Sequence, residues 1–137
     1  SMEFACKVAG SKLIVVLGHT KCGAVKGACD HVEMGNLTEL LSKLQPAVYS
    51  ESETTAIDKR NSKNGKFVEN VASLNVKRSV KSIIERSFIL EEMLNSGEIG
   101  IVGAMYNIDS GKVEVYKDVS YIKDEKNPKF NLAELRH

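Results

Sequence analysis

The sequence predicts an α/β fold with a mainly parallel central β-sheet flanked by helices, and three observations support this prediction. Lys12–Leu17 and Ile99–Tyr106 are apolar runs with little polar alternation, which is typical of strands buried on both faces of a parallel sheet. Segments with helical periodicity precede and separate these runs. The length of 137 residues is close to one domain at about 150 residues per domain, so residues 1–137 are expected to form a single domain.

The first elements follow in chain order from their periodicity. Met2–Ala9 carries apolar residues at helical spacing, and Gly10 follows as a plausible helix stop. Lys12–Leu17 is the first strand, and Gly18 is expected to end it. A helix is predicted from Cys22 to about Met34.

The middle of the chain is expected to be helical on both sides of a polar stretch. Tyr49–Lys66 is polar and is interpreted as a loop or a frayed helix, whereas Phe67–Glu85 predicts a long amphipathic helix. Asn75 marks a candidate break in that helix, and Ser87–Leu94 predicts a further short one. An earlier helix carries a leucine stripe that, like the apolar residues of the long helix, is expected to pack against the sheet or a partner chain: Leu37, Leu40, Leu41 and Leu44.

The end of the chain predicts a hairpin. Ile99–Tyr106 is the second strand, and Asn107–Gly111 contains the turn signal Asp-Ser-Gly. Lys112–Tyr116 alternates polar and apolar residues, as an exposed edge strand does. The periodicity after Asp118 is weak, and no element is predicted there.

Composition and charge exclude several classes of protein. Apolar residues make up 42% of the chain and charged residues 27%, which is typical of a soluble globular protein and unlike a disordered or collagen-like chain. The formal net charge of +1 gives no reason to expect nucleic-acid binding. The longest apolar run, Leu13–Leu17, is far shorter than the roughly 20 residues that cross a bilayer, so no membrane insertion is expected. Three cysteines, an odd number, argue against a disulfide framework and favour the cytoplasm.

A candidate metal site lies where the first strand ends and a helix begins. Ligands bind at the carboxyl ends of strands in open α/β sheets, and a turn there could bring His19 and Cys22 together. Imidazole and thiolate are ligands that zinc prefers, at about 2.0–2.1 Å and about 2.3 Å. A helix N-terminus lowers the pKa of a thiol, which favours the thiolate. Gly23 would let another group approach the site closely.

The spacing alone leaves other interpretations open. A His-x-x-Cys pair also occurs by chance. In that case Cys22 would be a small buried residue, and His19 would only form a hydrogen bond with the backbone. Cys29 follows Cys22 by seven residues, about 10 Å along a helix, so both cannot reach one zinc ion. Cys6 is most simply a core residue, and His31 points to a different helix face from Cys29. Only two ligands are therefore well placed, whereas a zinc site normally takes at least three from protein.

These residues resemble the β-class carbonic anhydrases. Gly18–Val25, with the sequence Gly-His-Thr-Lys-Cys-Gly-Ala-Val, is similar to the family pattern Gly-His-Ser-x-Cys-Gly-Ala after a hydrophobic strand. Ser1–Ala5 resembles the family's Ser-Leu-Glu-Tyr-Ala, and Asn70-Val71 resembles the Asn-Val of its long helix. Ile101–Ile108 resembles its closing hairpin. The similarity covers nearly the whole chain in the right order.

The resemblance implies reversible hydration of carbon dioxide to bicarbonate, with Zn²⁺ as cofactor. It implies that His19 and Cys22 are zinc ligands and that Gly23 shapes the substrate site. Zinc lowers the pKa of a bound water towards about 7, which supplies a nucleophile at neutral pH. Family members are dimers or dimers of dimers, so a homo-oligomer is expected.

One departure from the family pattern limits this expectation. Family members carry an earlier half with a Cys-x-Asp-x-Arg block, whose Cys is a zinc ligand and whose Asp binds the metal or pairs with the Arg. No such block occurs in this sequence. The chain is therefore expected to correspond to the C-terminal portion of the family fold, and alone to bind zinc weakly and hydrate carbon dioxide poorly or not at all. The alternatives are a non-catalytic carbonic anhydrase-like binding or regulatory module, and a structural domain that shares only the fold.

Overall fold

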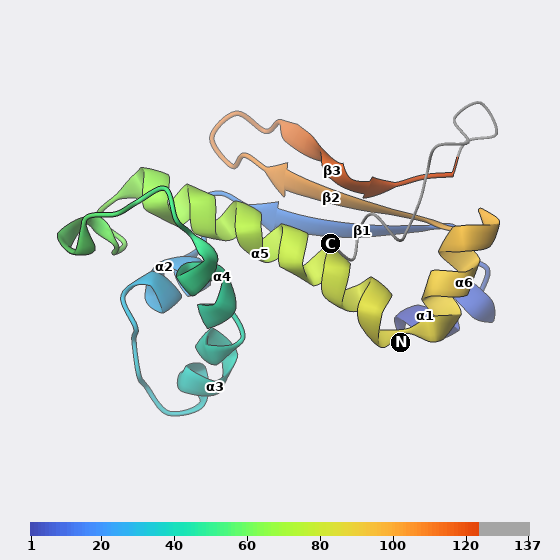
Figure 1. Ribbon diagram of the computed structural model, residues 1–137, viewed down its shortest axis with the longest axis horizontal. Coiled ribbons are helices and arrows are strands. Elements are labelled where there is room, and N and C mark those ends of the chain that lie inside the picture. The colour runs from blue at the N-terminus through green and yellow to red at the C-terminus, as the bar shows by residue number, and fades with distance from the viewer. Residues whose placement is uncertain (124–137) are drawn as a thin grey trace.

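A computed structural model describes residues 1–123, in which three strands form one sheet with the order β1-β2-β3 (Figure 1). β1 (Leu13–His19) pairs in parallel with β2 (Gly100–Tyr106), and β2 pairs antiparallel with β3 (Val113–Tyr121). The α/β class is confirmed. Within residues 1–123 the sheet contains one parallel and one antiparallel pair, because a short turn joins β2 to β3 and reverses the chain.

The long helix α5 (Gly65–Arg86) runs along one face of the sheet (Figure 1). The helix continues through Asn75, so the predicted break at this residue is wrong. Asn64 begins the helix by accepting a hydrogen bond from the Phe67 amide at 3.4 Å. None of the helices in residues 1–123 combines the length and apolar character that a bilayer crossing requires. The other helical elements are α1 (Met2–Lys7), α2 (Gly23–Cys29), α3 (Asn36–Ser42), α4 (Gln45–Ser50), the 3₁₀ turn η1 (Ile57–Lys59) and α6 (Phe88–Ser96).

Two predicted helices differ from the structure in their ends. The helix expected to reach Met34 ends at Cys29, and His31 then takes a left-handed φ of 53°, which a right-handed helix cannot contain. The leucine stripe is divided between α3 and the start of α4. Of its members Leu41 is fully buried, while Leu37 and Leu40 are exposed in this chain, so packing on the sheet is wrong for those two and contact with a partner chain stays a prediction.

The core consists of two clusters along α5. The first lies where the C-terminal part of α5 meets α6 and the sheet, and its buried members include Val80, Ile84, Leu90, Leu94 and Ile101. The second lies where the N-terminal part of α5 meets α2 and α4, and its buried members include Val25, Ala28, Phe67, Val71 and Val76. Leu74 packs at the edge of the second cluster and is only partly buried.

Gly18 lies inside β1 and does not end the strand. A Cβ atom on this residue would lie 2.7 Å from Val76 Cγ2 and 3.0 Å from Met105 Cε, closer than side-chain carbons pack. The absence of a side chain therefore lets α5 approach the end of β1 closely.

Replacing this glycine with alanine should destabilise the fold. We expect Gly18→Ala to lower the free energy of unfolding by about 1–3 kcal/mol, because the added methyl group overpacks the contact with Val76. Gly23→Ala is the matched control, since a Cβ atom there meets nothing within 4 Å. Urea denaturation of both variants measures the difference. Equal stability of the two would show that the close approach at Gly18 is unimportant.

The face of the sheet opposite α5 is open among the described residues. Leu13, Val15 and Leu17 of β1 are 51%, 53% and 54% exposed, and Val113 and Val115 of β3 are similarly exposed. We call these five residues the open sheet face. The expectation that the first strand is buried on both faces is wrong for residues 1–123, because no helix among them covers this side.

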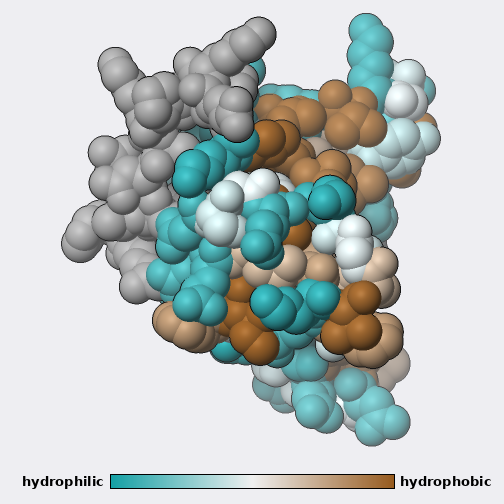
Figure 2. All heavy atoms as spheres, turned by 90° about the vertical axis from the view of Figure 1, so that its right-hand side faces the viewer, coloured by the Kyte–Doolittle hydropathy of each residue, from teal (hydrophilic) through white to brown (hydrophobic). Residues whose placement is uncertain are grey.

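Apolar side chains also reach the surface at the end of the molecule formed by α1 and α6. Figure 2 shows brown apolar residues there among hydrophilic ones, and the exposed side chains include Phe4, Val8 and Phe88. Exposed apolar patches of this kind are typical of interaction surfaces.

A buried acid orders the polar stretch that follows α4. Glu51 is only 3% exposed, and its carboxylate accepts hydrogen bonds from the Thr54 amide at 2.9 Å and the Thr54 hydroxyl at 2.6 Å. The Arg60 guanidinium donates to the carbonyl oxygens of Glu51 and Thr54 at 2.9 and 2.7 Å, and lies over the Phe67 ring at 4.8 Å. These contacts hold the segment in an ordered loop, although its sequence shows little periodicity.

The protonation of Glu51 should couple to stability. Burial acts to raise the pKa of its carboxyl group, but hydrogen bonds from Thr54 and Asn70 and the charge of Arg60 outweigh burial and lower it. A lowered pKa stabilises the fold above the usual value of about 4.3, and this contribution is lost as pH falls through the lower folded value. We therefore expect the stability difference between wild type and Glu51→Gln to shrink as the pH of urea denaturation falls from 7 to 3. A difference independent of pH would contradict this coupling.

Candidate metal centre

The two predicted ligands flank a tight loop at the carboxyl end of β1. His19 is the last residue of the strand, and Cys22 directly precedes the first helical residue of α2, with extended dihedrals of φ −69° and ψ 121°. Between them Lys21 takes a left-handed φ of 54°, an unfavourable conformation for a residue with a side chain. The strand, the loop and the helix thus place both residues at the carboxyl end of the sheet, where ligands bind in this class of fold.

The His19 ring is oriented by the backbone next to it. Its Nδ1 atom lies 3.0 Å from the carbonyl oxygen of Thr20. A carbonyl oxygen only accepts hydrogen bonds, so this contact requires a hydrogen on Nδ1. In the neutral imidazole the lone pair then lies on Nε2, the arrangement of a metal-binding histidine whose other nitrogen is anchored.

His19 and Cys22 line one pocket of about 410 Å³ between β1, α2 and α5. Most of the other lining residues are apolar, and the remaining polar ones come from α5 and the segment after α3. The lining includes Leu17, Val25, Lys43, Leu44, Asn75, Val76 and Ser79. His19 and Cys22 therefore border the same pocket, while the separation of their donor atoms stays a prediction.

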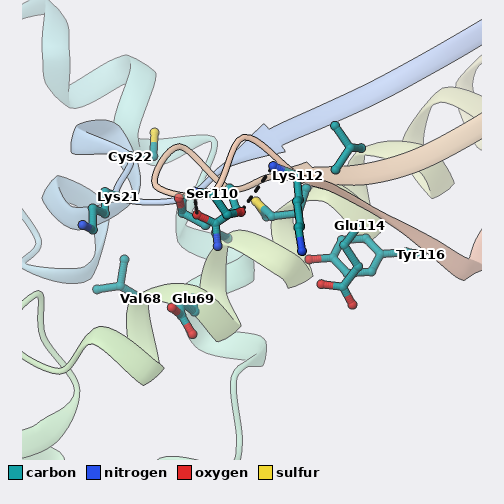
Figure 3. A pocket seen from close by; sticks show the side chains of 13 residues that line it. Lys21, Cys22, Val68, Glu69, Ser110, Lys112, Glu114 and Tyr116 are labelled. Atoms are coloured by element: carbon teal, nitrogen blue, oxygen red, sulfur yellow. Dashed lines mark hydrogen bonds between the residues drawn. The ribbon is translucent and has the colours of Figure 1, made fainter.

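A second pocket of about 520 Å³ lies on the other side of the loop, between α5 and the β2–β3 hairpin. Figure 3 shows Cys22 and Lys21 at one end of it and Lys112, Glu114 and Tyr116 at the other. Cys22 thus stands between the two hollows.

The other candidate ligands lie apart from this loop. Cys6 and Cys29 are buried in different core clusters, and burial, helped by the neighbouring Asp30 carboxylate, raises the pKa of the Cys29 thiol to about 11. Cys29 therefore stays protonated at neutral pH, whereas zinc binds the thiolate. The His31 ring packs near the Tyr49 ring, with centroids 6.2 Å apart. Within residues 1–123, no three His, Cys, Asp or Glu side chains are grouped to hold a metal ion.

Gly23 begins α2 and is exposed, with open space where a Cβ atom would be. The structure therefore leaves room for another group beside Cys22. The turn between β2 and β3 lies where Asn107–Gly111 predicts it, but its hydrogen bond to Thr20, in the loop between the ligands, is not predicted by spacing. The only signal for Thr20 was its place between His19 and Cys22.

Residues 1–113 of the chain match the carbonic anhydrase family. The chain belongs to the β-class carbonic anhydrase family. It is 28% identical over 130 residues to Carbonic anhydrase 2 of Mycobacterium tuberculosis (strain CDC 1551 / Oshkosh), an alignment that covers 91% of this chain and 58% of the relative.

Solved β-carbonic anhydrases share the fold. The enzyme CafA of Aspergillus fumigatus superposes with a TM-score of 0.67 at 27% identity, over 98% of this chain and 61% of the other. A tetrameric β-carbonic anhydrase of Sordaria macrospora gives a TM-score of 0.68 at 24% identity, over 85% of this chain and 57% of the other. The chain thus spans about three fifths of the length of these β-carbonic anhydrases.

Proposed function

We propose that this carbonic anhydrase chain supplies two zinc ligands, His19 and Cys22, to a centre that converts carbon dioxide and water reversibly into bicarbonate. The observation that supports the proposal most is that both side chains line one apolar pocket at the carboxyl end of β1. An imidazole with its Nε2 lone pair free and a partly exposed thiol are ligand types that zinc prefers.

The donor chemistry fits zinc, but the donor number is smaller than a complete site needs. A catalytic zinc site takes three protein ligands and leaves one position open. We propose that the remaining ligands come from outside residues 1–123. The outer edge of β1 is unpaired among these residues, so a parallel strand added there would end beside His19.

The loop residues and the apolar walls of the pocket have distinct roles in the proposed reaction. When bound, zinc supplies a Lewis acid that makes water a nucleophile at neutral pH. The hydrogen bond from His19 Nδ1 to Thr20 holds the imidazole in one orientation and one tautomer. The apolar walls formed by Val25, Leu44 and Val76 suit an uncharged substrate such as carbon dioxide.

Zinc titration of ligand variants tests this assignment. We expect His19→Asn and Cys22→Ser each to abolish saturable zinc binding, because a single remaining side chain gains little over hydrated zinc. His31→Asn is the matched control, since it removes an imidazole away from the loop and asparagine tolerates the left-handed φ at that position. Competition with a chromophoric chelator measures the affinity. Binding that survives either ligand substitution would show that the zinc lies elsewhere.

A non-catalytic binding or regulatory module is the second candidate function, and the presence of only two donors in residues 1–123 favours it. Zinc binding without hydration by the assembled protein would support this alternative.

We further propose that the protein is a homo-oligomer in the cytoplasm, where Cys22 stays reduced. The open sheet face and the apolar surface at α1 and α6 support self-association, and the Sordaria macrospora relative is tetrameric. Sedimentation equilibrium tests the oligomeric state.

A further inference from the structure

The two residues between the proposed ligands are fixed to the turn between β2 and β3. The Thr20 amide donates to the carbonyl oxygen of Tyr106 at 2.9 Å, and the Ile108 amide donates to the Thr20 hydroxyl at 3.1 Å. Lys21 Nζ lies 2.8 and 3.0 Å from the two carboxylate oxygens of Asp109. Both residues that separate His19 from Cys22 are therefore held by a segment about 90 residues later in the chain.

The turn that holds them is itself well defined. The Asn107 side-chain oxygen accepts hydrogen bonds from the amides of Asp109 at 2.9 Å and Ser110 at 3.2 Å, which forms an Asx turn. Gly111 has a φ of 73° and donates its amide to the Asn107 carbonyl oxygen at 2.8 Å. The turn therefore presents the Ile108 amide and the Asp109 carboxylate in fixed positions.

The loop needs such support because its backbone is strained. A left-handed conformation is unfavourable for a residue with a side chain, and Lys21 holds it with a φ of 54°. Residues in such conformations persist where surrounding contacts fix them. In this loop, the contacts of Thr20 and Lys21 with the hairpin fix the left-handed conformation of Lys21.

The two contacts differ in strength. The Lys21 and Asp109 side chains are 58% and 64% exposed, so solvent and salt screen their ion pair. Thr20 is half-buried; its amide donates to Tyr106 at the end of β2, and its hydroxyl accepts from Ile108 in the turn. Its carbonyl oxygen also accepts the hydrogen bond from His19 Nδ1. Thr20 thus links the imidazole to the hairpin.

We propose that Thr20 is a positioning residue for the metal centre. Its hydroxyl group, bonded to the Ile108 amide, keeps the His19–Cys22 loop in the conformation that presents the imidazole and the thiol to one metal ion. The proposal rests on the proposed zinc-binding function, because it assigns Thr20 a role towards those two ligands. Partners that orient a metal ligand typically contribute about 10–100-fold in metal affinity.

The test compares Thr20→Val, which removes the hydroxyl at nearly constant shape, with Thr20→Ser, which keeps it. Cobalt(II) is titrated into each 137-residue chain, and thiolate-to-cobalt absorption reports binding through Cys22. We expect Thr20→Val to weaken cobalt binding about 10–100-fold and Thr20→Ser to restore most of it. Asp109→Asn should have a smaller effect. Urea denaturation of the metal-free variants checks that Thr20→Val remains folded.

A second measurement determines the tautomer of His19 in the metal-free protein. Nitrogen-15 NMR of the imidazoles should show wild-type His19 protonated on Nδ1, and a mixture of tautomers in Thr20→Val but not in Thr20→Ser. Unchanged tautomer populations in folded Thr20→Val would overturn the proposal, as would unchanged cobalt affinity. If wild type binds no cobalt through Cys22 while the tautomer shift still occurs, the zinc-binding function is wrong but the positioning of His19 by Thr20 stands.

Discussion

Supplied with zinc, the 137-residue chain is expected to hydrate carbon dioxide several orders of magnitude more slowly than a complete carbonic anhydrase. Two protein ligands leave the other zinc positions to water, so the ion binds weakly and lacks the set of three protein ligands that a catalytic zinc site takes. Among residues 1–123 no further His, Cys, Asp or Glu side chain joins His19 and Cys22 in a metal-binding group. Stopped-flow hydration assays with a pH indicator measure the rate.

The control for this assay is a relative that is longer than the region aligned with this chain. Carbonic anhydrase 2 of Mycobacterium tuberculosis, of which the alignment covers 58%, is assayed beside this chain and its His19→Ala variant. Fast zinc-dependent turnover by the chain, lost in His19→Ala, would show that copies of this chain complete the site themselves. Such a result would contradict the expectation that this chain alone supplies only two zinc ligands.

Truncating Phe67 should have the largest effect on stability. Its side chain is fully buried in the second core cluster and lies under the Arg60 guanidinium. We expect Phe67→Ala to lower the free energy of unfolding by about 3–5 kcal/mol, from lost burial and the cavity left behind.

Two variants set the scale for this measurement. Ile57 is 87% exposed, so Ile57→Ala should change stability by no more than about 0.5 kcal/mol. Leu74→Ala, for which full burial predicts a loss of about 2–5 kcal/mol, should fall towards the low end because Leu74 is only partly buried. Urea denaturation at one pH compares all three. A Phe67→Ala effect no larger than that of Ile57→Ala would show that the second cluster does not hold α5 to α2 and α4.

Periodicity and apolar runs predicted the main elements correctly. Both parallel strands and α5 lie where the sequence predicts them, because their patterns extend over many residues. The ends of elements were less predictable, since they depend on single backbone conformations such as the left-handed φ of His31. A glycine after an apolar run predicts the end of a strand, whereas Gly18 lies within β1 and lets α5 approach closely, a tertiary contact that local sequence does not contain.

The candidate site could be predicted only in part for the same reason. The place of His19 and Cys22 after a buried strand was readable from the sequence, and the family resemblance gave their roles. The hydrogen bonds of Thr20 to Tyr106 and Ile108 join segments far apart in the chain, so spacing does not reveal them. The exposure of β1 was also unpredictable, because its apolar run indicates burial without saying which chain or segment covers it.

X-ray absorption spectroscopy of the zinc-loaded chain tests the central claim most directly. If His19 and Cys22 bind the metal together, the spectrum of the wild type shows a sulfur neighbour at about 2.3 Å and nitrogen or oxygen neighbours at about 2.0–2.1 Å. The sulfur should be absent in Cys22→Ser, the imidazole scattering should be absent in His19→Asn, and His31→Asn should match the wild type. A sulfur neighbour that persists in Cys22→Ser, or its absence from the wild type, would contradict the assignment of these two residues to the zinc site.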